Sequence, residues 1–258
     1  MLNEDAVRRY FMYLAYKGTH YCGWQNQPNG ISIQQCIEEA LSKALRQSVA
    51  VTGAGRTDAG VHARRMVAHF DTSTIVPDCQ VLTCKLNNML PKDIAVQTVV
   101  PVINGAHARF DALSRTYIYM ITDLKNPFQY EYVYRMSLQS VDFEKMNKAC
   151  AVFYDISDFT SFSKVHTDVK THECRIFEAG WTKSDDIWTF TVRANRFLRN
   201  MVRAMVGTLL DVGRAKMTIS DLRAIIEAKD RCRAGMSIAP DGLSLSEIEY
   251  PEQLFVLD

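Results

Sequence analysis

The sequence predicts a mixed α+β fold with much antiparallel sheet. Segments of strand composition and segments of helical spacing alternate in both halves of the chain, and some strand segments are close enough in sequence to pair as hairpins. Of the 258 residues, 47% are hydrophobic and 23% are charged, as in an ordinary globular protein with a large core. This mixture favours an antiparallel-rich sheet over a doubly wound parallel one.

The first half is expected to contain three strands and one helix. The aromatic-rich residues 10–17 predict a strand, and residues 18–30 contain turn-forming glycines and a proline. Ser32 is a typical N-cap for the helix whose apolar side chains follow it at helical spacing. Further strands are predicted at residues 61–70 and 93–102.

The pattern breaks around Asn104 and Gly105, where we place a boundary between domains 1–104 and 105–258. The second domain is expected to contain strands at 115–122, 176–181, 187–194 and 243–250, and helices at 142–154, 197–212 and 220–229.

Charge and cysteine content limit the possible functions. The chain has 30 basic and 29 acidic side chains, so a nucleic-acid surface would have to come from local clustering. The seven cysteines show no C-x-x-C spacing, which indicates free thiols and no metal site. No signal-peptide pattern and no membrane-spanning stretch is recognisable, so we expect a cytoplasmic protein without membrane association.

Residues 53–63 read GAGRTDAGVHA, with Asp58 as a lone acid among small residues. The loop fits neither common phosphate-binding template, and a tight turn without special duty is the simplest alternative. The small residues would let a planar substrate approach closely, and a carboxylate can act as nucleophile or general base. Retaining glycosidases normally use two acids, one of which protonates the leaving group. A single acid would fit a reaction in which the departing nucleobase is recaptured and not lost.

Two further groups of side chains are candidates for substrate contacts. Arg196, Arg199 and Arg203 would share one face of the predicted helix, either as a solvated basic stripe or as a track for phosphates. Arg203 lies among apolar residues and would need an acidic partner. Tyr117 and Tyr119 alternate along a predicted strand, where aromatic residues usually belong to the core but can also stack on a base.

Six ordered blocks resemble the tRNA pseudouridine synthase A family. GAGRTDAGVHA is similar to its catalytic motif, and the other blocks are residues 21–28, 86–94, 107–119, 197–209 and 239–243. Ala106 stands where the family usually has Phe, and residues 163–174 do not match closely, which leaves the contacts of that segment unassigned.

The resemblance implies two similar α/β halves that share an extended, largely antiparallel sheet with a central catalytic cleft. It implies an enzyme that isomerises uridine to pseudouridine in the anticodon stem-loop of tRNA, at nucleotides thirty-eight to forty. Family members act as homodimers that hold tRNA across both subunits, and the reaction needs no cofactor and no metal. The alternatives from other classes are a non-catalytic tRNA-binding module and a glycosidase that releases the base.

The resemblance also implies roles for individual residues. Asp58 aligns with the essential acid, which attacks C1′, attacks C6 or takes the C2′ proton. Arg203 aligns with the arginine that pairs with this acid and favours its ionised form. Tyr117 aligns with the tyrosine that stacks on the target base, and Arg56 with the arginine that fills the gap left by the extruded uridine. Arg196 and Arg199 are expected to contact the RNA.

Overall fold

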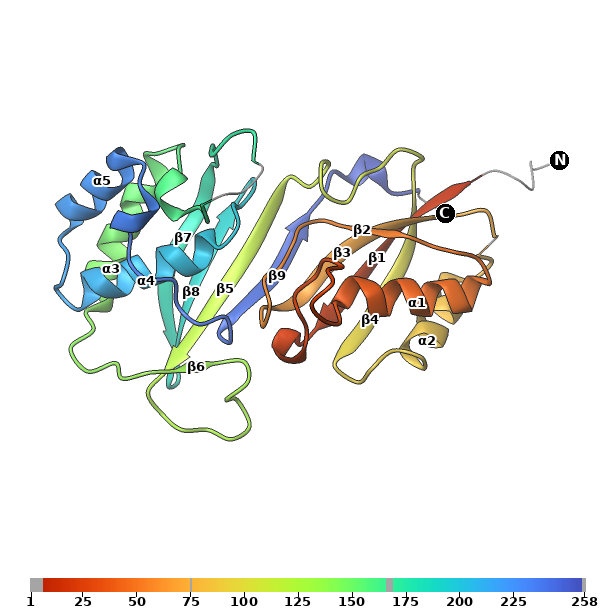
Figure 1. Cartoon of the computed structure of the whole chain (residues 1–258), viewed down its shortest axis with the longest axis horizontal. Coiled ribbons are helices and arrows are strands. Elements are labelled where there is room, and N and C mark those ends of the chain that lie inside the picture. The colour runs from red at the N-terminus through yellow and green to blue at the C-terminus, as the bar shows by residue number, and fades with distance from the viewer. Residues whose placement is uncertain (1–6, 75, 166–168, 257–258) are drawn as a thin grey trace. The chain divides into compact units, whose positions relative to one another are not determined.

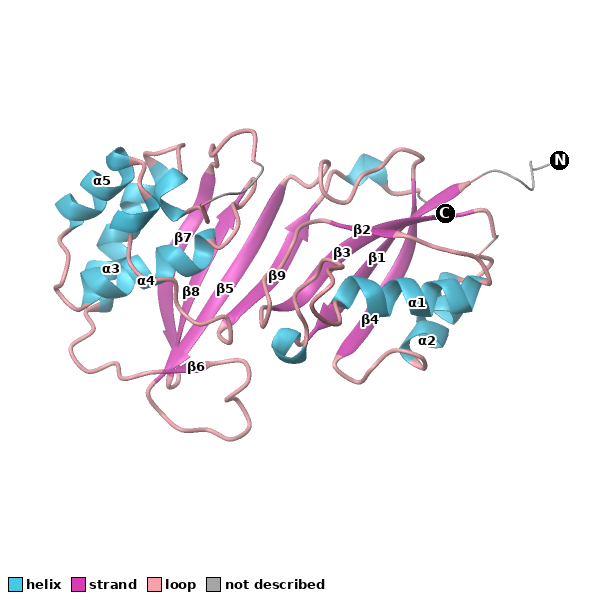
Figure 2. Cartoon of the chain, viewed as in Figure 1, coloured by secondary structure: helices cyan, strands magenta, loops and turns pink. Residues whose placement is uncertain are grey.

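The computed structural model describes residues 7–74, 76–165 and 169–256. In these residues strands and helices alternate along the chain (Figures 1 and 2). The strands are β1 (Arg8–Tyr16), β2 (Val51–Gly53), β3 (His62–Thr72), β4 (Ile94–Val102), β5 (Ser114–Thr122), β6 (Tyr134–Arg135), β7 (Ile176–Ser184), β8 (Ile187–Ala194) and β9 (Leu243–Glu249). The helices are α1 (Ile33–Leu45), α2 (Cys79–Asn87), α3 (Phe143–Cys150), α4 (Met201–Gly213) and α5 (Ile219–Ala228).

The strands form one sheet in the order β4-β1-β3-β9-β5-β8-β7, with β2 on β3 and β6 on β5. The pairs of β1 with β3 and β4, of β2 with β3, and of β8 with β5 and β7 are antiparallel, whereas β5 and β6 are parallel. The mixed fold with a mostly antiparallel sheet, predicted from the sequence, is confirmed.

Two compact units divide the chain. One comprises Met1–Leu113 with Leu245–Asp258, and the other comprises Ser114–Ser244. Strand β9 therefore begins in the second unit and continues in the first. The domain boundary expected between residues 104 and 105 falls inside the first stretch of the first unit, and the division into domains 1–104 and 105–258 stays a prediction.

In the first unit, β1 lies between β3 and β4, and its apolar side chains supply much of the core. Phe11, Met12 and Leu14 are completely buried. Helix α1 begins as the sequence predicts, because the Ser32 hydroxyl accepts a hydrogen bond from the Gln35 N–H at 3.0 Å. Helices α1 and α2 lie together beside these strands (Figure 1).

Helix α2 is absent from the sequence prediction. The Asp78 carboxylate caps it by accepting the N–H groups of Gln80 and Val81 at 2.7 and 3.1 Å. The helix is short, and few of its residues are buried, so its apolar periodicity is weak. Its position depends on a tertiary contact: the Asn87 side chain donates to the Val96 carbonyl and accepts from the Val96 N–H, both at 2.8 Å.

In the second unit, β5, β8 and β7 form an antiparallel group, and α3 packs against β7 and α4. Asp185, in the turn between β7 and β8, has φ +51°, a conformation that Asp tolerates better than most residues. The strands predicted at residues 176–181 and 187–194 are therefore present and pair as a hairpin. In the described ranges 7–74, 76–165 and 169–256, no helix combines the length and the apolar character that crossing a bilayer requires.

The predicted start of the long helix is wrong. Helix α4 begins at Met201, because Asn200 has φ +65° and cannot continue a right-handed helix. The Asn200 amide donates to the Ser237 hydroxyl at 2.5 Å, which holds this break in place. Arg196 and Arg199 precede the helix, so they do not share a helical face with Arg203 as the spacing had suggested.

Candidate active site

The loop with Asp58 connects β2 to β3 in the first unit and is closed by its own backbone. The Val61 N–H donates to the Asp58 carbonyl at 3.1 Å, and Gly60 has φ +80°, as the third residue of a type II turn requires. The Ala54 N–H donates to the Val67 carbonyl at 2.8 Å. Asp58 is the first residue of this turn, and its side chain is half-buried. The tight turn that the glycines indicate therefore exists, and it fixes the backbone beneath the acid.

Thr57 attaches the loop to the core. It is 6% exposed, and its hydroxyl lies 2.9 Å from the phenol oxygen of Tyr16 at the end of β1. Its carbonyl accepts the N–H of Trp24 at 3.1 Å. Gly23 has φ +91°, and a Cβ there would lie 2.5 Å from the Thr57 carbonyl oxygen. Only a glycine lets this neighbouring segment approach so closely, and the approach restrains the residue before Asp58.

The segment before α1 supports the same loop at its other end. The Gly18 N–H donates to Nδ1 of the buried His62 at 3.1 Å, and a Cβ on Gly18 would lie 2.0 Å from the Val61 carbonyl oxygen. The Tyr21 hydroxyl donates to the Asp93 carboxylate at 2.6 Å. Burial, together with this hydrogen bond, raises the pKa of Tyr21 well above its ordinary value.

Thr57, His62 and Asp93 lie in blocks that resemble the family, as do Tyr21, Gly23 and Trp24, but the sequence interpretation assigns no role to any of these supporting residues. The density of glycines in residues 18–30 was the available signal, but it could not reveal which backbone atoms approach one another.

Tyr117, in the second unit, lies on β5 opposite Val192 of β8 and is half-buried. Its ring packs edge-on against Phe197, with centroids 5.0 Å apart. Tyr119 is completely buried, and its hydroxyl donates to the Ala239 carbonyl at 2.8 Å. Burial raises the pKa of Tyr119 far above its ordinary value. Tyr119 is therefore a core residue, whereas part of Tyr117 is accessible to a ligand.

Arg203 lies in the first turn of α4 and is half-buried. Its Nε donates to the Ile238 carbonyl at 2.6 Å, and the Ile238 N–H donates to the Arg203 carbonyl at 3.2 Å. The segment around Ile238 approaches the helix closely, because a Cβ on Gly207 would lie 1.8 Å from the Met236 carbonyl oxygen. These contacts orient the guanidinium group.

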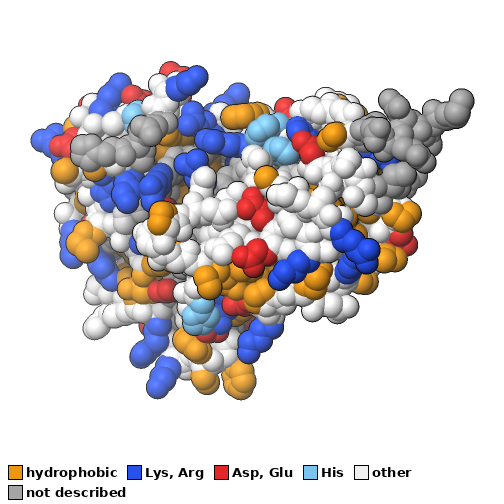
Figure 3. Space-filling model, turned by 45° about the vertical axis from the view of Figure 1, so that its right-hand side comes forward, with side chains coloured by type: hydrophobic (Ala, Val, Ile, Leu, Met, Phe, Trp, Pro, Cys, Tyr) orange, Lys and Arg blue, Asp and Glu red, His pale blue; other side chains and the backbone are white. Residues whose placement is uncertain are grey.

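The other expected substrate-binding arginines lie in loops. Arg56 is exposed in the Asp58 loop, and Arg199 is exposed just before α4, where its carbonyl accepts the Lys164 N–H at 3.0 Å. Arg196 is half-buried and directly precedes Phe197, the residue that Tyr117 contacts. Figure 3 shows Lys and Arg side chains in several groups on the visible face, separated by acidic and uncharged side chains.

The predicted site residues are divided between the units. Asp58 and Arg56 belong to the first unit, whereas Tyr117, Arg203 and the two loop arginines belong to the second. Within the second unit, the Tyr117–Phe197 contact joins β5 to the segment that leads into α4. The chemical roles of all these residues stay predictions.

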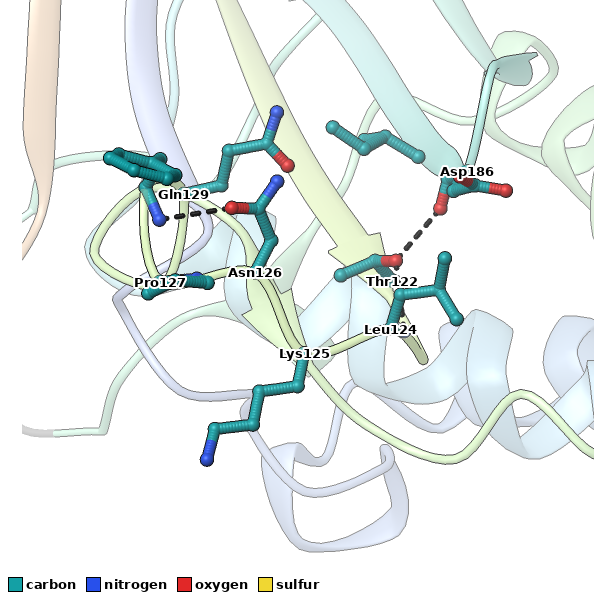
Figure 4. A pocket seen from close by; sticks show the side chains of 9 residues that line it. Thr122, Leu124, Lys125, Asn126, Pro127, Gln129 and Asp186 are labelled. Atoms are coloured by element: carbon teal, nitrogen blue, oxygen red, sulfur yellow. Dashed lines mark hydrogen bonds between the residues drawn. The ribbon is translucent and has the colours of Figure 1, made fainter.

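A separate pocket of about 290 Å³ lies at the end of β5 (Figure 4). Thr122, Asn126 and Asp186 contribute to its wall, and the Thr122 hydroxyl donates to the Asp186 carbonyl at 2.8 Å. The Lys125 side chain extends away from these residues in Figure 4. None of the predicted site residues lines this pocket.

Comparisons with known proteins agree with the resemblance seen in the sequence. A family model described as "tRNA pseudouridine synthase" matches residues 12–111 and 156–251. A protein of Parabacteroides distasonis named tRNA pseudouridine synthase A is 58% identical over 252 residues, which cover 98% of this chain and 100% of that protein.

Two further relatives carry the same name. The protein of Bacteroides fragilis is 56% identical over 251 residues, covering 97% of this chain and 99% of its own length. The protein of a Geobacter species is 39% identical over 249 residues, covering 95% of this chain and 100% of its own length. The match therefore extends over both units, and this chain belongs to the tRNA pseudouridine synthase family.

Proposed function

We propose that this chain is an isomerase that converts uridine to pseudouridine in tRNA. The observation that carries the proposal is the family match, which spans the Asp58 loop in one unit and α4 in the other. In this reaction the bond between C1′ of the ribose and N1 of uracil breaks, the base turns while it is still held, and C5 bonds to C1′. N1 gains a proton and C5 loses one, so nothing is oxidised or reduced.

Asp58 is proposed as the reactive acid. The turn from Asp58 to Val61 and the anchored Thr57 fix the backbone from which its side chain projects. It attacks C1′, attacks C6 or takes the proton from C2′. The small neighbours Ala59 and Gly60 limit the steric bulk around it, which suits the approach of a flat base.

Arg203 is proposed to pair with Asp58 during the reaction. A guanidinium whose Nε is held by the Ile238 carbonyl presents its two terminal nitrogens in a fixed direction. A contact through both nitrogens would keep the carboxylate ionised and aimed at the sugar.

Tyr117 is proposed to stack on the extruded uracil, and Arg56 to fill the space left in the RNA. Extruding a base costs a few kcal/mol, and both contacts would offset part of this cost. Arg196 and Arg199 are proposed to contact the phosphates. With a net charge of only +1, RNA binding would rest on such local groups.

The finer parts of the proposal concern the target and the assembly. We propose that the modified nucleotides lie at positions thirty-eight to forty of the anticodon stem-loop, and that a cytoplasmic homodimer holds the tRNA. Mapping pseudouridine in tRNA from a strain that lacks this gene tests the positions. Light scattering of the purified protein tests the assembly, since a homodimer has twice the mass of one chain.

The decisive experiment measures tritium release from tRNA labelled at C5 of uridine. Asp58→Asn is expected to lower the rate at least ~100-fold while tRNA is still bound, because the amide cannot replace the reactive carboxylate. Asp123→Asn, which changes an exposed acid, serves as the control and keeps the wild-type rate.

Other outcomes would favour the alternatives. Release at the wild-type rate by Asp58→Asn would remove Asp58 from the chemistry. Wild-type protein that binds tRNA without releasing tritium would be a binding module, and free uracil with abasic RNA would identify a glycosidase.

A further inference from the structure

Phe110 is an exposed aromatic residue that has an ordered support. It is 74% exposed, yet its ring packs on that of His107 with centroids 4.2 Å apart. The His107 ring in turn meets His69 edge-on, with centroids 4.6 Å apart. The guanidinium carbon of Arg109 lies 5.6 Å from the centroid of Phe110. The three rings thus form a column from the buried strand β3 to the surface of the first unit.

The backbone that carries Phe110 is a closed turn. The His107 N–H donates to the Asp111 carboxylate at 2.7 Å, and the Asp111 N–H donates to the His107 carbonyl at 3.0 Å. Nδ1 of His107 accepts the N–H groups of Arg109 and Phe110 at 3.1 and 3.3 Å. The turn therefore holds Phe110 in place without covering it.

The turn is fastened to the core of the first unit from several elements. Nδ1 of His69 accepts the Ala108 N–H at 3.1 Å, and the Tyr250 hydroxyl donates to the Ala108 carbonyl at 2.5 Å. Arg9, on β1, donates to the Ala106 carbonyl at 2.9 Å. Holding an apolar ring in water this firmly has no evident benefit for the stability of the unit, since the ring itself stays exposed.

An unpaired nucleotide base is the ligand that this surface fits. A fixed aromatic ring offers one face for stacking, and base–aromatic stacking tolerates any base sequence. The neighbouring guanidinium supplies a positive charge that suits the phosphate of the same or the next nucleotide.

We propose that residues 107–110, here called the stacking turn, bind an unpaired base of tRNA outside the catalytic contacts, with Phe110 as the stacking surface and Arg109 as the phosphate contact. This inference rests on the proposed tRNA substrate. It assigns a role to residues 107–110, the first part of the block 107–119, which the proposed chemistry leaves without one.

The test compares Phe110→Ala, Phe110→Trp and wild type for tRNA affinity and for tritium release at saturating tRNA. Phe110→Ala is expected to weaken binding about 5- to 100-fold and to raise KM more than it lowers kcat. Phe110→Trp restores binding, because it keeps an aromatic face. Phe128→Ala, at a residue that is 91% exposed in the second unit, is the matched control and binds like wild type.

A crosslinking experiment identifies the occupant. The protein with p-benzoylphenylalanine in place of Phe110 is expected to crosslink to tRNA on illumination. The proposed role of the stacking turn would be overturned if Phe110→Ala bound tRNA as tightly as wild type, or if the crosslink formed to a second copy of the chain in place of RNA. In either case, tritium release by the wild-type protein would still uphold the proposed function. A wild-type protein that neither bound nor converted tRNA would overturn both.

Discussion

Thr57 shows how a residue without chemistry of its own positions one that is proposed to react. Its hydroxyl reaches the Tyr16 phenol in the core, and its carbonyl accepts the Trp24 N–H. The sequence indicates Asp58 through its unusual surroundings, but a threonine beside it looks unremarkable until its burial is known. Contacts of this kind depend on which distant atoms meet, and local pattern does not contain that information.

The first prediction concerns the Tyr16–Thr57 hydrogen bond. Tyr16→Phe and Thr57→Val are each expected to destabilise the protein by about 1–2 kcal/mol, because each removes the bond and leaves the other hydroxyl buried without it. The double variant should lose less than the sum, since both changes remove the same bond. Urea denaturation of the four proteins measures this coupling; strictly additive losses would show that the bond contributes nothing.

Arg203 gives the second prediction. Arg203→Lys is expected to lose most of the tritium-release activity, because an ammonium group cannot hold the Ile238 carbonyl through Nε and also make a two-pronged contact with a carboxylate. Arg223→Lys, at an exposed position on α5, is the control and retains activity. Near-normal turnover by Arg203→Lys would exclude the proposed pairing with Asp58.

Among the elements, those with strong periodicity were predictable from sequence, and those defined by tertiary contacts were not. β1, α1, β5, β8 and α5 lie close to their expected positions. Helix α2 has few buried residues and depends on the contact of Asn87 with β4, so its period was too weak to recognise. The start of α4 was placed too early, because a left-handed Asn200 interrupts a sequence whose apolar spacing continues through it.

The turn beside the Asp58 loop gives the third prediction. Gly23→Ala is expected to destabilise the protein by about 1–3 kcal/mol, because φ is +91° and the new methyl group would collide with the Thr57 carbonyl. Gly55→Ala is the control in the same region, since its new methyl group would meet no atom within 4 Å beyond the adjacent residues and its φ is not in the left-handed range. Thermal unfolding should separate the two variants, and equal melting temperatures would contradict the argument.

On the scale of the whole molecule, pH is expected to act through a buried histidine. Burial, with the positive charge of Arg9 and the neighbouring His107, lowers the pKa of His69 from 6.5 to about 4, against the opposing effect of Asp71 and Asp111. Between these values the unfolded chain therefore binds a proton that the folded chain does not bind. The neutral form of His69 therefore contributes to the free energy of unfolding in full above pH 6.5, and this contribution falls as the pH drops toward 4.

The fourth prediction is the size of this effect. Denaturation between pH 7 and pH 4 should show a loss of up to about 1.4 kcal/mol per pH unit from one such proton. The pKa of His107 is also lowered, chiefly by burial, so it adds to the same trend. His69→Asn should have a shallower slope, whereas His20→Asn, at an exposed position, should keep the wild-type slope. A wild-type slope in His69→Asn would contradict the assignment.

The first unit consists of two stretches that are far apart in the chain. Met1–Leu113 is translated first, but Leu245–Asp258 emerges from the ribosome only after all of Ser114–Ser244. The late stretch contributes the Glu249 carbonyl that accepts the Leu113 N–H and the Leu254 carbonyl that accepts the Ile103 N–H. During synthesis, the continuous second unit can therefore reach its final structure while the earlier-made unit, with the Asp58 loop, still lacks its closing strand.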